Sequence, residues 1–275
     1  MWTLSGFADE ISPDLDEQVR VLKELGMTQL ELRGAWDTNV SDFDDEQVER
    51  IARTLDGAGI TVSSIGSPIG KVPVTADLDE HVARFRRCAQ VGRRLGAPYV
   101  RVFSFYPRDA HDPAADRDTV LRGMSALAAA AEQHGVVMLH ENEKAIYGDV
   151  PDRCLDIVES VGSPALRLTW DPANFVQCGV RPFSEGYEML RPYVDYIQIK
   201  DAIAATGEVV PAGKGDGEVA QTLAALRADG FDGCFSLEPH LAQAHATGGF
   251  SGPELFATAH AAFTGLLREQ DIPFR

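Results

Sequence analysis

Short apolar runs alternate with amphipathic segments along the whole chain. Residues 3–7 are typical of a short strand. Leu15, Val19 and Leu22 then recur at the spacing of one helical face. Gly26 follows that segment, and glycine readily takes the left-handed conformation in which many helices end. This opening stretch therefore predicts a strand, a helix and a turn before the next strand begins.

The same arrangement repeats along the rest of the sequence. The expected strands are Thr3–Phe7, Gln29–Arg33, Thr61–Ile65, Tyr99–Phe103, Val136–Glu141, Leu166–Asp171, Val194–Lys200 and Cys234–Glu238. Helical periodicity separates them; the sixth helix, around Glu185–Leu190, has the weakest pattern, and the last begins at Pro253. Strict alternation of strands and helices predicts a parallel sheet, and eight such units in ~270 residues match a closed barrel. We therefore expect a single α/β domain over residues 1–275, a (β/α)8 TIM barrel.

Local signals define the first helix and two long loops. The first helix is expected to start at Ser12-Pro13-Asp14, with the Ser12 hydroxyl as its cap. The longest stretches without periodicity are Ser104–Ala115 and Leu241–Ser251. Both follow expected strands, and in a parallel barrel these connections lie on the side where active sites form. We expect them to cover a substrate.

The composition narrows the classes of partner. A formal net charge of −17 at pH 7 disfavours nucleic-acid binding, since phosphate contacts need clustered Lys and Arg. The sequence has no apolar stretch of ~18 residues and no secretion signal at its start, so we expect a cytoplasmic protein without a membrane span. No G-x-G-x-x-G follows the first strand, which disfavours a dinucleotide site. The four cysteines form no C-x-x-C pair, so we expect no disulfide framework and no structural zinc site.

Four of the expected strands end in a side chain that carries oxygen: Glu141, Asp171, Gln198 and Glu238. The carboxyl ends of all strands in a parallel barrel share one mouth, so these side chains are expected to converge there. Three carboxylates and an amide oxygen favour one divalent ion, Mn²⁺ or Mg²⁺. The alternative for each acidic residue taken alone is that it only caps the following helix.

The segments around these four residues form motifs. They are Leu-His-Glu141-Asn142-Glu, Trp-Asp171-Pro-Ala-Asn174, Gln198-Ile-Lys200-Asp201 and Ser-Leu-Glu238-Pro-His240. Together they resemble the sugar phosphate isomerase/epimerase family, within the xylose isomerase-like TIM barrel superfamily. The glycine-rich segment from Pro211 to Gly217 is similar to that family's loop between strands seven and eight. The resemblance covers essentially the whole chain, but its motifs do not specify a substrate.

The resemblance implies roles for the four strand-end residues. Glu141, Asp171, Gln198 and Glu238 would hold the ion, and Glu141 and Glu238 would also move protons. The family usually has His in place of Gln198, and often His in place of Asn174. A glutamine binds through oxygen, which favours a harder ion, and it is also similar to the dehydratase branch that acts on dehydroshikimate.

This pattern predicts a sugar or keto-polyol isomerase or epimerase, acting on a phosphorylated or unphosphorylated substrate. In the expected mechanism the ion polarises a carbonyl and stabilises an enediolate, while one glutamate removes the neighbouring proton and the other returns it. Dehydration begins with the same proton abstraction, so a dehydroshikimate dehydratase-like lyase remains an alternative. A non-catalytic sugar-binding homologue is another, because Gln198 and Asn174 depart from the family. The endonuclease branch is disfavoured, because its several histidine ligands are absent and the net charge is negative.

Other side chains near the strand ends are candidates for contacts with a small carbohydrate or polyol. They are Lys200, His240, Arg33, Asn174, Arg101 and Lys144. Lys71, Lys214 and the Gly213–Gly217 stretch are candidates for a phosphate. Barrels of this kind often pair, so a homodimer is one expectation. Arg167 shares strand parity with Asp171, which predicts either a polar barrel interior or a bulge in that strand.

Overall fold

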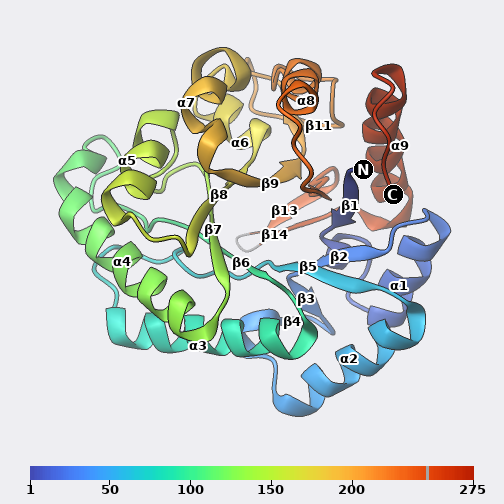
Figure 1. The fold of residues 1–275 in the computed structure, drawn as a ribbon, viewed down its shortest axis with the longest axis horizontal. Coiled ribbons are helices and arrows are strands. Elements are labelled where there is room, and N and C mark those ends of the chain that lie inside the picture. Colours follow the sequence, from blue (N-terminus) through green and yellow to red (C-terminus); the bar gives the residue numbers. More distant parts are fainter. Residues whose placement is uncertain (246–247) are drawn as a thin grey trace.

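The computed structural model describes residues 1–245 and 248–275 and forms a ring of eight parallel strands (Figure 1). The barrel strands are β1 Thr3–Gly6, β2 Gln29–Leu32, β5 Thr61–Ile65, β6 Tyr99–Val102, β7 Val137–Glu141, β8 Leu166–Trp170, β9 Val194–Ile199 and β12 Cys234–Leu237. They are neighbours in the order β1-β12-β9-β8-β7-β6-β5-β2. A parallel bridge between Phe7 and Glu31 joins the two end strands and closes the ring. The predicted TIM barrel is confirmed.

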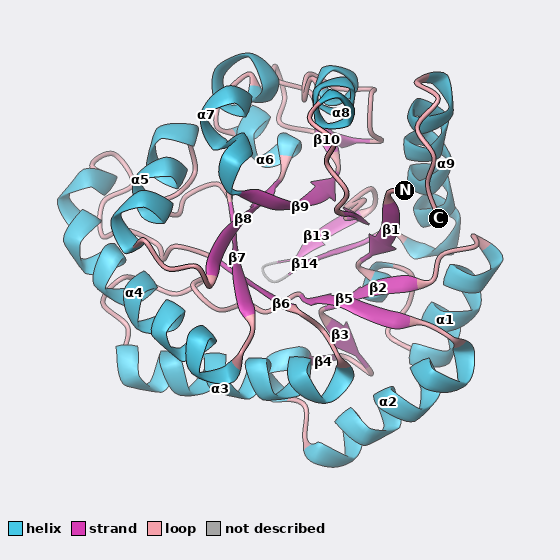
Figure 2. Ribbon diagram, in the orientation of Figure 1, coloured by secondary structure: helices cyan, strands magenta, loops and turns pink. Residues whose placement is uncertain are grey.

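Helices surround the ring of strands on all sides (Figure 2). They are α1 Leu15–Glu24, α2 Asp45–Ala58, α3 Leu78–Leu95, α4 Arg117–His134, α5 Pro151–Val161, α8 Val219–Ala228 and α9 Gly252–Glu269. The expected cap of the first helix was wrong, because Asp14 rather than Ser12 accepts the N–H of Glu17. The Ser12 hydroxyl instead accepts the N–H of Asp14. Within the described ranges, no helix is both long and apolar enough to cross a membrane.

The connection between β8 and β9 differs from the single helix expected around Glu185–Leu190. It contains α6 Pro172–Gln177, a π-helix Pro182–Tyr187, α7 Glu188–Leu190 and a 3₁₀ turn Arg191–Tyr193. Asp171 caps α6 and Pro172 occupies its first turn, so this helix begins directly at the strand end. The sequence prediction missed α6 because its residues show no clear helical periodicity.

Three short hairpins follow barrel strands and lie at the mouth. They are β3 Gly34–Ala35 with β4 Thr38–Asn39, β10 Asp201–Ala202 with β11 Val209–Val210, and β13 Gln243–His245 with β14 Gly248–Phe250. The third replaces the irregular loop expected at Leu241–Ser251, of which residues 246–247 lie outside the described structure. Single 3₁₀ turns, Ala8–Glu10, Val40–Asp42 and Pro113–Asp116, complete the connections.

The interior of the barrel is more polar than the layers of branched apolar side chains usual in this fold. The Ser63 hydroxyl lies 2.6 Å from the Ser5 hydroxyl and 2.8 Å from the hydroxyl of Tyr196 across the barrel. Strand β8 carries a register irregularity after Leu168, and Arg167 pairs with Asp195. The irregular strand, one of the two alternatives that the sequence left open, is therefore present, and Arg167 lies partly exposed near the start of this strand.

His81 on α3 holds the connection that follows β5, and this gives a testable pH dependence. Its Nε2 accepts the N–H of Gly70 at 2.7 Å, and burial lowers the pKa of His81 to about 4. The unfolded chain therefore binds more protons than the folded chain between about pH 6.5 and 4. The contribution of His81 to the free energy of unfolding is complete above pH 6.5. About 3 kcal/mol of it is lost as the pH falls toward 4.

Urea unfolding of the wild type and His81→Gln between pH 7.5 and 4.5 measures this contribution. A glutamine oxygen can accept the same N–H but does not titrate. The wild type should lose more stability than the variant as the pH falls, and parallel curves would contradict the assignment.

Candidate active site

Three strand ends bring Glu141, Asp171 and Glu238 together at the mouth of the barrel. Glu141 is the last residue of β7, Asp171 follows β8, and Glu238 follows β12. One carboxylate oxygen from each lies within 4.8 Å of the other two, and all three side chains are buried. The convergence expected from the alternating pattern is thus present for these three of the four predicted residues.

Lys200, Arg101 and Arg33 are buried cations that contact these carboxylates. The Lys200 ammonium lies 2.7 Å from Asp171 Oδ2 and 2.5 Å from Glu238 Oε2. Arg101 contacts Glu141 at 2.8 Å, and Arg33 contacts Glu238 at 3.2 Å. The cluster is therefore a network of opposite charges rather than a group of isolated acids.

Aromatic rings hold the two guanidinium groups in place. Arg33 and Arg101 both lie over the ring of Phe7, at 4.6 and 5.1 Å from its centroid, and Arg101 also lies 4.6 Å from the centroid of Phe103. Arg101 further donates to the carbonyl of Ser67. These contacts limit the orientations of both arginines and leave them aimed at the carboxylates.

Gln198 is fully buried on β9, and neither its amide nitrogen nor its amide oxygen has a hydrogen-bond partner among the residues that the structure describes. Burying an amide without partners is costly, so the site lacks a group that would bind this side chain. A water molecule or a metal ion would satisfy its oxygen. Among the candidate ligands, Gln198 is thus the one whose surroundings most directly indicate a missing partner.

Asn174 and Asn142 form hydrogen bonds with Glu141 and Asp171. Asn174 Nδ2 donates to Glu141 Oε1 at 3.0 Å, and its backbone N–H donates to Asp171 Oδ1 at 2.9 Å. The side chain of Asn142 exchanges two hydrogen bonds with the backbone of Asp171. Asp171 therefore caps α6 through Oδ1, while its Oδ2 contacts Lys200 in the cluster, so capping the helix does not keep this carboxylate away from the cluster.

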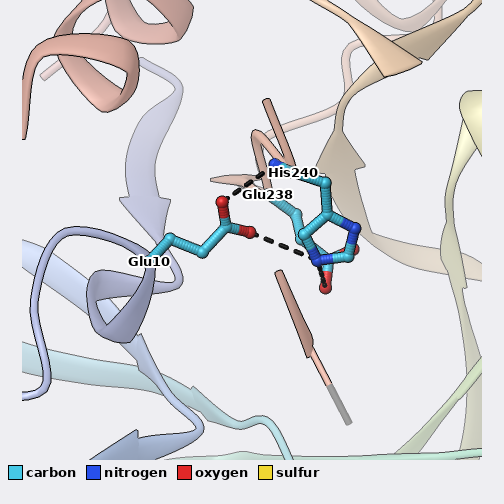
Figure 3. A group of neighbouring side chains, drawn as sticks. All are labelled: Glu10, Glu238 and His240. Atoms are coloured by element: carbon cyan, nitrogen blue, oxygen red, sulfur yellow. Dashed lines mark hydrogen bonds and ion pairs between the residues drawn. The ribbon is translucent and has the colours of Figure 1, made fainter. Parts of the chain in front are cut away.

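His240 and Glu10 form the next layer beside Glu238 (Figure 3). His240 Nε2 lies 3.3 Å from Glu10 Oε1 and 3.4 Å from Glu238 Oε1. Glu10 is fully buried, and burial raises its pKa against the opposing effect of His240 and Arg33. The sequence analysis selected His240 but missed Glu10. The sequence feature that points to Glu10 is its position in an acidic pair soon after the first strand, at the same mouth of the barrel as the carboxylates.

The remaining candidates lie apart from the carboxylates. Lys144 is largely exposed and donates to Gln177, while Lys71 pairs with Glu143 at 2.9 Å. The backbone N–H groups in the glycine-rich loop are not open to a phosphate. Those of Gly213, Gly215 and Gly217 all donate to the carboxylate of Asp201.

The protein tunes the proton affinities of the three central carboxyls differently. Burial raises the pKa of Asp171 to about 7, with Glu141 and Glu238 adding to the rise and Lys200 opposing it. Burial also raises the pKa of Glu141, although Arg101 opposes the change. Burial alone would raise the pKa of Glu238, but Lys200, His240 and Arg33 hold it well below its usual value. Glu238 is therefore the carboxylate that stays ionised most readily.

The buried charges at this end of the barrel do not balance. Among the described residues, five buried carboxyls, those of Glu10, Glu31, Glu141, Asp171 and Glu238, face three buried cations, those of Arg33, Arg101 and Lys200. Full ionisation leaves an excess of two negative charges. Asp201 is also buried, but backbone N–H groups surround its carboxylate. An excess of two negative charges and an unpartnered amide oxygen fit a divalent cation.

The sequence also matches a family model and a curated protein. The sequence model of the xylose isomerase-like TIM barrel family matches residues 19–261. A curated relative, 2-epi-5-epi-valiolone 7-phosphate 2-epimerase of Actinoplanes sp., is 31% identical over 179 residues. This match spans 65% of the present chain and 64% of the relative, which is less than two thirds of its length.

Solved structures share the fold over nearly the whole chain. A D-tagatose 3-epimerase-like protein superposes with a TM-score of 0.79 at 15% identity, covering 98% of both chains. A probable 3-DHS dehydratase of Bacillus anthracis superposes with a TM-score of 0.75 at 18% identity, covering 96% of this chain and 98% of the other. At these identities the similarity establishes the fold alone. Since the family match extends over most of the sequence, the chain belongs to the xylose isomerase-like TIM barrel family.

Proposed function

We propose that this protein is a divalent-metal-dependent epimerase or isomerase of a small keto-sugar, keto-polyol or sugar phosphate. The observation that carries the proposal is the buried cluster of Glu141, Asp171 and Glu238, at an end of the barrel where the described buried carboxyls outnumber the buried cations by two, together with the amide of Gln198, which has no hydrogen-bond partner among the described residues. The epimerase name of the curated relative supports the same class of reaction.

Glu141, Asp171, Gln198 and Glu238 would hold the ion, and oxygen ligands alone favour Mn²⁺ or Mg²⁺. When bound, such an ion supplies positive charge that polarises a carbonyl and stabilises the anion left when the neighbouring proton departs. The ligand set fits this role because one oxygen from each of the three carboxylates already lies within 4.8 Å of the others.

The chain's own groups would carry the proton transfer. Glu238 stays ionised beside Lys200 and Arg33, so it is in the form that can accept the proton next to the carbonyl. Glu141 has a raised pKa and is suited to return a proton. Return to the opposite face of the same carbon gives epimerisation, and return to the adjacent carbon gives isomerisation.

Five of the expected substrate contacts belong to this network. Lys200, Arg33, Arg101, Asn174 and His240 each contact at least one of the central carboxylates, so a substrate bound at the ion would meet them. Lys144 is peripheral and would reach only a longer or phosphorylated substrate.

Metal content and solvent exchange test the proposal together. Protein purified with Mn²⁺ or Mg²⁺ should retain about one ion per chain. Incubation in deuterated water with keto-sugars, sugar phosphates, a valiolone phosphate and dehydroshikimate, followed by NMR, should show deuterium at the carbon next to a carbonyl. A new alkene or aromatic signal would instead identify a lyase. A lyase is the second candidate because Gln198 is similar to the ligand of the dehydratase branch. No retained ion and no exchange with any compound would favour a sugar-binding homologue.

A further inference from the structure

Glu10 lies next to the proposed proton-transfer group and uses both of its oxygens on the segment that follows β12 (Figure 3). Its Oε2 accepts the backbone N–H of His240 at 2.8 Å and the hydroxyl of Ser251 at 2.7 Å. The backbone carbonyl of Glu10 also accepts the N–H of Ser251 at 3.0 Å. One residue from the β1 connection therefore holds both ends of the segment that contains the β13–β14 hairpin.

His240 has an unusual backbone that these contacts help to maintain. Its φ angle is +48°, in the left-handed region that a residue other than glycine rarely adopts. Such a conformation costs about 1–3 kcal/mol and persists where the surroundings enforce it. The hydrogen bond from the His240 N–H to buried Glu10 is one such constraint, and the conformation turns the ring back toward Glu238.

The ring of His240 is placed between two carboxyl groups. Its Nε2 lies 3.3 Å from Glu10 Oε1 and 3.4 Å from Glu238 Oε1. Carboxylate oxygens accept hydrogen bonds, so this nitrogen is favoured to carry a hydrogen. Arg33 lies beside the same two oxygens, 3.8 Å from Glu10 Oε1 and 3.2 Å from Glu238 Oε1. The positive charge of Arg33 compensates the neighbouring carboxylates of Glu10 and Glu238, so no second metal ion is needed to explain why they lie together.

We propose that Glu10 is a positioning residue, which holds the His240 backbone and keeps the edge of the His240 ring that carries Nε2 beside Glu238 Oε1. The consequence is that Glu238 presents its other oxygen, Oε2, on the side of Lys200 and Asp171. This inference rests on the proposed function in so far as Glu238 is the group that accepts the proton.

Glu10→Gln tests the proposal with almost no change in side-chain volume. The backbone N–H of His240 needs an acceptor, so the amide oxygen should take that place and the NH₂ group should face His240 Nε2. That nitrogen must then accept a hydrogen bond, and its hydrogen moves to Nδ1. In protein labelled with ¹⁵N-histidine, the Nε2 signal should shift from a protonated to an unprotonated nitrogen, with His240→Gln used to assign it.

The same variant should lower kcat about 10- to 100-fold, the usual effect of removing a group that orients a catalytic side chain, with KM changed less than about threefold. Ser251→Ala is the matched control, because it removes a neighbouring contact to Glu10 Oε2 but leaves Oε1 facing the ring. It should preserve the nitrogen signal and most of kcat. Glu10→Gln should also add little to the loss caused by His240→Gln, because both changes act through one ring.

An unchanged Nε2 signal in Glu10→Gln would overturn the proposal, as would equal losses of kcat in Glu10→Gln and Ser251→Ala, which would show that Glu10 only anchors the loop. The nitrogen measurement needs no substrate. If the wild-type protein exchanges no substrate proton, the proposed function fails while the positioning of His240 is still decided by NMR.

Discussion

Glu238→Gln should lower the rate of solvent exchange into substrate by at least about 10³-fold. The amide cannot accept the proton, and it also removes the negative charge that Lys200 and Arg33 contact. The fold should survive, because Lys200 keeps Asp171 and Arg33 keeps Asp9 as ion-pair partners. Proton NMR in deuterated water measures the exchange, and circular dichroism measures the fold.

Glu17→Gln provides the control for this prediction. Glu17 also pairs with an arginine, Arg20, but on the exposed surface of α1, where the pair contributes little. This variant should keep wild-type exchange rates. Exchange by Glu238→Gln within about tenfold of the wild type would remove Glu238 from the mechanism, because general acid–base groups contribute at least about 10² to the rate.

The strand-end residues could be predicted because a short rule places them. Alternation of strands and helices fixes a parallel barrel, and a parallel barrel puts Glu141, Asp171 and Glu238 at one mouth. Strand parity then places Lys200 on the same face as Gln198, and Arg33 and Arg101 at the corresponding positions of their strands. All of this needs only the local pattern and the closure of the sheet.

Residues on the connecting segments could not be found in the same way. Glu10 reaches His240 and Ser251, which lie far away in the sequence, through the turn after β1. The pair of Lys71 and Glu143 likewise joins two connections. Such contacts depend on the paths of loops, which follow from packing rather than from periodicity. The hydrogen bonds from the glycine-rich loop to the Asp201 carboxylate could not be predicted for the same reason.

With Gln198 as a ligand, the proposed ion site would differ from one with a fourth charged or histidine ligand. A neutral amide would add no charge to the ion, so the three carboxylates alone would balance the ion and their other partners. Lys200 contacts two of these carboxylates and its pKa is held well above the usual value by Asp171, Glu238 and Glu141, despite burial. Its ammonium thus competes with an ion for the same oxygens, which predicts weaker ion binding than the carboxylates alone would give.

Lys200→Met should make the stability of the protein depend strongly on divalent ions. Removing this member of the buried charge network leaves Asp171 without its ion-pair partner and Glu238 with Arg33, and breaking a buried pair typically costs about 3–5 kcal/mol. In the presence of a chelator the variant should melt roughly 10 °C below the wild type. Millimolar Mn²⁺ or Mg²⁺ should restore most of this difference, because an ion that binds only the folded state stabilises it by mass action. The wild type should gain less, since its own ammonium already lies against those oxygens.

Thermal unfolding with and without a chelator measures both effects, and Lys23→Met, an exposed lysine in the last turn of α1, is the matched control. The control should melt with the wild type in either condition. If Lys200→Met melts lower but gains no more from the ion than the wild type does, the carboxylates that Lys200 contacts are not ligands, and the excess negative charge at the mouth must be balanced by protons on Asp171 and Glu31, whose pKa values burial already raises to about 7.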